Sequence, residues 1–121
     1  MTVTFEDVEG FVIPFIKSYT SVHVGTKVPK DRPATFVRAW VNGGAAINRV
    51  LERVQVTVDC WAPSTTTASE LAGAIRHGFL NDKIHDLVRG VEEVTRPYSA
   101  PDEASERYRA TYALLVRGAR I

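Results

Sequence analysis

The chain has little of what marks secreted or membrane proteins. It contains one cysteine in 121 residues and no apolar run long enough to span a bilayer. Cys60 alone cannot form an internal disulfide, and a lone buried cysteine behaves as a small hydrophobe, which fits synthesis in a reducing, intracellular compartment. Residues 1–20 lack a basic stretch before an apolar run, so we expect no secretory signal.

The chain also lacks an excess of either charge. Fifteen basic side chains against fourteen acidic ones leave a formal net charge of +1. This balance gives no global electrostatic reason to expect tight binding to nucleic acid or to an anionic membrane, so any such contact must be local. The length predicts a single domain over residues 1–121, able to bury roughly two-thirds of its unfolded surface without a disulfide or a metal.

Recognisable catalytic motifs are missing as well. Cys60 and the three histidines, His23, His77 and His85, do not form a pattern that combines a nucleophile, a base and an orienting acid. We therefore predict that the protein is not an enzyme. The sequence between His77 and His85 contains Asp82, but this spacing matches no standard metal-ligand pattern, and we expect no metal and no cofactor.

Two other candidate sites fail on geometry. Gly43 and Gly44 do not follow a strand and open a helix in the order needed to cradle a phosphate. Glu92 and Glu93 are neighbours in a predicted strand, so their side chains should point to opposite faces and cannot converge as an acid/base pair.

What the chain does have is clear periodicity between Arg53 and Leu80. Apolar residues alternate with polar ones from Val54 to Cys60, which predicts a strand with one buried face. Thr67 is followed three residues later by Glu70, the spacing of a capping box, so we predict that Thr67 caps a helix. The apolar stripe of that helix comprises Ala68, Leu71, Ala72, Ile75 and Phe79.

The first forty residues predict a helix and two strands. A helical stripe runs from Phe5 to Tyr19, with Thr4 as its candidate cap, and Pro14 predicts a kink or an early end. A short strand over Ser21–Thr26, a loop over Lys27–Ala34 and a firmer strand over Thr35–Val41 should follow.

Asn42-Gly43-Gly44 is a strong turn signal, yet the next strand restarts at Arg53, so the connection must be long and apolar. It contains Ile47, Arg49 and Leu51. Two interpretations stay open: the segment extends the two strands and packs on the same domain, or it projects as a hairpin that docks on another subunit.

The last third predicts two more strands. One covers Asp86–Arg96, a loop follows over Pro97–Ser105, and a cleanly alternating strand runs from Arg107 to Arg117. Arg107 and Arg109 share the outward face of that strand. They form either a solvated or salt-bridged edge, or a basic surface that faces an acidic neighbouring subunit or passing DNA.

These elements predict an α+β fold, a mainly antiparallel β-sheet of four to five strands with two helices packed on one face. Phe36, Trp40 and Trp61 should occupy the opposite face and form an aromatic surface that a partner could cover.

The order and spacing of these segments resemble the tail terminator proteins of long-tailed, siphovirus-type bacteriophages, especially those of actinobacterial phages and prophages. The segments that carry the resemblance are the early helix, Val28–Arg38 with Arg32-Pro33-Ala34-Thr35-Phe36-Val37-Arg38, the strand Val56–Ala62, the helix Ala68–Arg76 and the final strand Arg107–Gly118. They span almost the whole chain.

The resemblance implies a non-catalytic virion protein that assembles as a ring, usually a hexamer, on the head-proximal end of the tail tube. The ring would stop tube polymerisation and join the tail to the head connector, and DNA would pass through its channel without specific binding. Its partners would be further copies of itself, the tail tube protein and the connector, with no membrane. It would be made in the bacterial cytoplasm and end in the virion.

On this interpretation, the Asn42–Glu52 segment contacts the tube or the adjacent subunit, and the tryptophans are core or interface anchors. The predicted interface residues are Trp40, Ile47, Arg49, Leu51, Trp61, Arg107 and Arg109. Two alternatives remain: another neck or head-completion protein of a phage, and a small-ligand-binding α+β domain, which would need a concave polar pocket.

Overall fold

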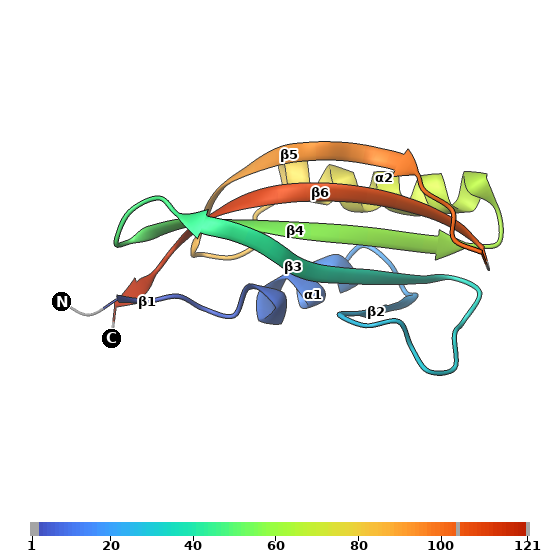
Figure 1. Cartoon of the computed structure of the whole chain (residues 1–121), viewed down its shortest axis with the longest axis horizontal. Coiled ribbons are helices and arrows are strands. Elements are labelled where there is room, and N and C mark those ends of the chain that lie inside the picture. The colour runs from blue at the N-terminus through green and yellow to red at the C-terminus, as the bar shows by residue number, and fades with distance from the viewer. Residues whose placement is uncertain (1–2, 104, 121) are drawn as a thin grey trace.

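A mixed sheet with the strand order β2-β3-β4-β6-β5 organises the chain. The computed structural model describes residues 3–103 and 105–120 (Figure 1). Its elements are β1 (Val3–Thr4), α1 (Val8–Lys17), β2 (His23–Gly25), β3 (Phe36–Ala46), β4 (Leu51–Ala62), α2 (Thr65–Asn81), β5 (Val88–Ser99), β6 (Glu106–Arg117) and β7 (Ala119–Arg120). Every pair of neighbours in the large sheet is antiparallel except β2 and β3. The predicted α+β fold with a mainly antiparallel sheet is confirmed.

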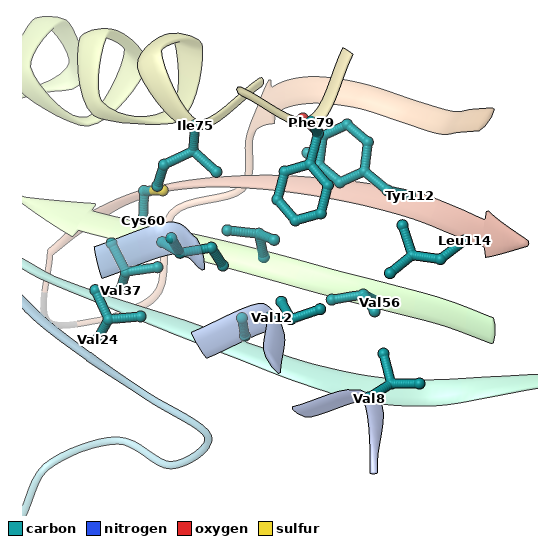
Figure 2. Close-up of a cluster of buried hydrophobic side chains, with 14 of the residues drawn as sticks. Val8, Val12, Val24, Val37, Val56, Cys60, Ile75, Phe79, Tyr112 and Leu114 are labelled. Atoms are coloured by element: carbon teal, nitrogen blue, oxygen red, sulfur yellow. The ribbon is translucent and has the colours of Figure 1, made fainter. Parts of the chain in front are cut away.

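Both helices contribute to one hydrophobic core on a single face of the sheet. Val12 and Ile16 of α1 and Ile75 and Phe79 of α2 join the alternate residues of β4, including Cys60, in this core. Figure 2 shows Phe79 beside Tyr112, whose rings stack with centroids 4.3 Å apart. The alternation seen in the sequence therefore assigns the core-facing residues of β4 correctly. The prediction of a single buried face is wrong, because Thr57, Asp59 and Trp61 on the other face are buried as well.

Helix α1 is shorter than predicted. It begins at Val8, and the Asp7 side chain caps it by accepting a hydrogen bond of 3.2 Å from the Glu9 amide. The predicted cap at Thr4 is wrong because Thr4 is part of β1, which pairs with β7. The helix continues past Pro14 and ends at Lys17.

Helix α2 begins before its predicted cap. Ser64 is the N-cap, and its hydroxyl accepts a hydrogen bond of 3.2 Å from the Thr67 amide. The capping box predicted for Thr67 and Glu70 is therefore wrong, because Thr67 already lies in the first turn. Four of the five predicted core residues of this helix are buried, namely Ala68, Ala72, Ile75 and Phe79.

Strand β5 is longer than predicted and passes through Pro97 to Ser99. It is an edge strand, and its register shifts between Thr95 and Tyr98, so Pro97 removes no ladder hydrogen bond that a central strand would need. The predicted Pro97–Ser105 loop shrinks accordingly. The two-stranded β1–β7 sheet is a feature that the sequence pattern did not indicate.

Candidate functional site

The structure separates the seven predicted interface residues into two places. Ile47, Arg49 and Leu51 belong to the end of the β3–β4 hairpin. Trp40, Trp61, Arg107 and Arg109 lie on the sheet face that neither helix covers. We call this second surface the helix-free face. Its central residues are Phe36, Arg38, Trp40, Thr57, Asp59, Trp61, Arg107, Arg109 and Thr111.

The hairpin is an extension of both strands, and it projects. Pairing continues from Val41 to Ala46 on β3, with a register shift between Val41 and Gly43. The predicted turn at Asn42-Gly43-Gly44 is wrong, because both glycines stay within the strand at φ values of 134° and 136°. Residues 42–49 are exposed, and Figure 1 shows the hairpin extending beyond the helices. The segment extends both strands but does not pack on the domain, and it projects as the second interpretation predicts. Docking on another subunit stays a prediction.

Gly44 is required for this geometry. A Cβ on Gly44 would lie 2.0 Å from the Arg53 carbonyl oxygen on the paired strand, and its φ disfavours other residues. Nothing lies within 4 Å of a Cβ built on Gly43. The glycine pair therefore serves strand pairing and a bulge instead of a chain reversal.

The actual reversal is a compact turn over residues 47–50. The amides of Ile47 and Asn48 donate to the Leu51 carbonyl at 2.9 and 3.1 Å, and the Asn48 side chain accepts from the Val50 amide at 2.9 Å. The Gly118 amide donates to the Val50 carbonyl at 2.9 Å, which ties the turn to the end of β6. Ile47 is 47% exposed at this braced tip.

The helix-free face is organised around a buried carboxylate. Asp59 is 1% exposed, and its oxygens accept two hydrogen bonds from Arg109, at 2.7 and 2.8 Å, while Arg107 lies 4.0 Å away. The hydrogen bond to Asp59 raises the pKa of the Arg109 guanidinium. The salt-bridged alternative for these arginines is confirmed. The edge position is wrong, because β6 lies between β4 and β5.

Sequence reasoning missed the role of Asp59. The alternation pattern placed Asp59 on the polar face of the strand, where side chains usually face solvent. The available signal was the register: an antiparallel pairing of the two cleanest strands puts Asp59 directly opposite Arg109.

Trp61 belongs to the interior of the chain. Its ring stacks on Phe36 with centroids 4.5 Å apart, its indole N–H donates to Asp102 at 2.7 Å, and it is 2% exposed. Of the two anchor roles predicted for Trp61, the structure supports the core role. Trp40 is half-buried beneath Arg38, whose guanidinium carbon lies 3.9 Å from the ring centroid.

The candidate catalytic and metal residues are dispersed. Burial raises the pKa of the Cys60 thiol, which is fully enclosed. His85 stacks on Phe11 with centroids 4.4 Å apart, whereas Asp82 accepts a hydrogen bond from the Tyr19 hydroxyl. Among residues 3–103 and 105–120, no three His, Cys, Asp or Glu side chains are grouped so that they could hold a metal ion.

The two neighbouring glutamates diverge as predicted. Glu93 accepts two hydrogen bonds from Arg76 of α2, at 2.7 and 2.9 Å, on the helix-covered face. Glu92 lies 3.5 Å from Arg53 on the opposite face. They therefore act in separate ion pairs.

In the described part of the chain, no helix combines the length and the apolar character needed to cross a membrane. No protein-family model matches the sequence, and no curated protein matches it significantly.

Proposed function

We propose that the chain is a structural virion protein that caps the head-proximal end of a phage tail tube as a ring. The ring stops tube polymerisation and forms the surface that joins the tail to the head connector. It is a hexamer of this chain, its partners are the tail tube protein and the connector, and DNA passes through its channel without specific binding. The protein has no catalytic step and no cofactor. It is made in the host cytoplasm and resides at the neck end of the virion tail.

The observation that carries this proposal is the braced hairpin at the end of the sheet. A tip that presents Ile47 and Arg49 on a hydrogen-bonded turn loses little conformational entropy on binding, because its shape is already fixed. The tip also leaves Ile47 47% exposed and accessible to a partner. The α+β sheet and the sequence resemblance described above support the same function.

The mechanism is a difference between the two faces of the ring. One face complements the last ring of the tube, and the other cannot accept a further tube subunit, so polymerisation stops. We place the hairpin tip on the tube side or at the adjacent subunit.

The test is the substitution Ile47→Asp, with Leu80→Asp as a matched control, because Leu80 is similarly exposed at 46% but lies on α2. We expect Ile47→Asp to keep the far-ultraviolet circular dichroism of the parent and to lose binding to purified tail tubes in a sedimentation assay. Leu80→Asp should bind like the parent. Parent protein that ignores tubes at high concentration would overturn the function, and normal tube binding by Ile47→Asp would overturn the role of the tip.

A further inference from the structure

A groove of about 450 Å³ opens where the sheet extends beyond the start of α1. Its floor is the helix-side surface of the hairpin, including Val41, Ala46 and Val54, and residues 6–9 form its wall. Farther along the sheet α1 covers this same face. Here Val54 is still buried at 6% exposure and Val41 packs against the core, but residues 43–46 are exposed. The open part of the groove floor is therefore the stretch of β3 that ends at Ala46.

The rim of this groove is acidic. Glu6, Asp7, Glu9 and Glu52 line it. Glu9 also accepts a hydrogen bond of 3.0 Å from the Val41 amide, and burial raises the pKa of the Glu52 carboxyl. None of the four takes part in an ion pair among residues 3–103 and 105–119. The one basic lining residue, Arg53, is directed to Glu92.

A complementary segment lies at the opposite end of the molecule. Lys27 and Lys30 are exposed and flank Val28, which is 41% exposed, and Pro29. Within the described residues neither lysine forms an ion pair. Figure 1 shows this β2–β3 connection and the hairpin at opposite ends of the long axis. The segment thus offers an apolar side chain between two cations.

The segment is held in place at both ends. The Arg38 side chain donates to the Thr26 carbonyl at 2.9 Å, just before Lys27. Arg32 donates to Asp102 at 2.7 Å, just after the segment, and Pro29 limits its backbone. A segment fixed in this way loses little entropy when it docks.

We propose that residues 27–30 of one copy dock in the groove of the next copy. Val28 packs on the floor at Ala46, and the lysines face Glu6 and Glu52 at the rim. The inference rests on the proposed ring and names the contact that would build it. Because the two surfaces lie at opposite ends of the chain, the contact is head-to-tail, the type that closes into a ring when the rotation permits.

The first test is a disulfide between two variants. Val28→Cys and Ala46→Cys proteins are mixed under mild oxidation, and Cys60 is left in place because it is fully buried. We expect a covalent heterodimer to form rapidly, since docking brings the two positions within disulfide reach, about 4–7 Å between Cα atoms. Val28→Cys mixed with Leu80→Cys is the control and should remain uncoupled. Coupling that is no faster than in this control would overturn the proposal.

The second test reverses charge on each side. Lys27→Glu/Lys30→Glu and Glu6→Lys/Glu52→Lys should each weaken self-association about tenfold or more, measured by sedimentation velocity, because like charges then face one another. A mixture of the two variants should associate, since each segment then meets a groove of opposite charge on the other variant. The control Lys83→Glu/Arg89→Glu makes the same charge change elsewhere on the surface and should behave like the parent.

These outcomes are distinct from failure of the proposed function. Rings whose mass is unaffected by the charge reversals would overturn the groove contact and leave the ring in place. A chain that stays monomeric at every concentration would overturn the groove contact, and tube binding would then judge the capping function separately. Coupling of Ala46→Cys with Ile47→Cys, but not with Val28→Cys, would show that the groove binds the hairpin tip of a second copy. That result would overturn the present assignment.

Discussion

The Arg109 guanidinium holds both oxygens of the buried Asp59 carboxylate, with Nε 2.7 Å from Oδ1 and Nη2 2.8 Å from Oδ2. This pair joins β4 to β6 at the centre of the face that no helix covers. Arg107 lies 4.0 Å from the same carboxylate, and its guanidinium carbon is 5.6 Å from the centroid of the Trp61 ring.

Removing either partner of this pair should have unequal effects on stability. Arg109→Met leaves the Asp59 charge buried with only the distant Arg107, and we expect a loss of about 3 kcal/mol in the free energy of unfolding. Asp59→Asn should cost less, about 1–2 kcal/mol, because the Arg109 side chain is 33% exposed and water can solvate it. The double variant should lose less than the sum of the two. Urea denaturation of all three measures this, and equal single-variant losses that add fully would contradict the account.

Alanine substitutions at two glycines of α2 should have opposite effects on the stability of the protein. Nothing lies within 4 Å of a Cβ built on Gly73, so Gly73→Ala should stabilise the protein by about 0.5–1 kcal/mol through helix propensity. A Cβ on Gly78 would lie 2.5 Å from Cζ of Tyr19, so Gly78→Ala should lose this gain and displace the ring. In a Tyr19→Ala background the substitution at Gly78 should become stabilising. Thermal unfolding of the parent, the three single variants and the Tyr19→Ala/Gly78→Ala double variant decides the point, and a stabilising Gly78→Ala in the parent would show that the ring does not pack there.

The hydrogen bond between Tyr19 and Asp82 should make stability depend on alkaline pH. It is the main cause that raises the pKa of Tyr19 from 10.0 to about 12. In the unfolded chain the phenol ionises near pH 10, whereas the folded protein keeps the proton. The stabilisation is therefore complete below pH 10 and is lost as the pH rises through 12.

Tyr19→Phe should remove the contribution of the Tyr19–Asp82 hydrogen bond to the free energy of unfolding. The stability of the variant should therefore change less than that of the parent between pH 10 and 12. Ultraviolet titration of tyrosine in the parent should reveal one phenol fewer ionising near pH 10 than expected from exposure. Identical pH profiles for parent and variant would refute the role of Asp82.

Alanine substitutions at Gly43 and Gly44 should distinguish the cost of backbone strain from the cost of a steric clash. Gly43→Ala meets no atom within 4 Å and carries only the cost of a φ of 134°, about 1 kcal/mol. Gly44→Ala has similar backbone strain and in addition drives a Cβ into the Arg53 carbonyl, so we expect a loss of at least about 2 kcal/mol. Unfolding free energies of the pair test this, and equal losses would mean that the strands are not paired at Gly44.

Local periodicity predicted which segments form strands better than it predicted where those strands begin and end. The alternation in β4 and β6 identifies both strands and the residues that face the core, but it does not predict burial: residues 56–62 of β4 are buried on both faces. The glycine pair at residues 43–44 misled because the same dipeptide permits a turn or a bulge, and only the pairing with Gln55 and Val54 selects the bulge. Thr67 misled for a similar reason: residues 64–67 all carry hydroxyl groups, and Ser64 is the one that adopts the capping conformation.

Contacts between distant segments could not be predicted from the sequence. Asp59 and Arg109 are fifty positions apart, and their meeting depends on the β4–β6 register. The groove depends on where α1 begins relative to the hairpin, and β1 and β7 are two residues each, too short to show a period. The exposed tip at Ile47 was suggested by its apolar composition, whereas its projection beyond the helices needed the full fold.

The central claim, a ring that caps tail tubes, is tested most directly by the native mass of the purified protein, measured together with negative-stain images of the same sample mixed with tubes. The account predicts the mass of a closed oligomer, or a density restricted to one end of each tube. A monomer at every concentration, with tubes left bare at both ends, would contradict it.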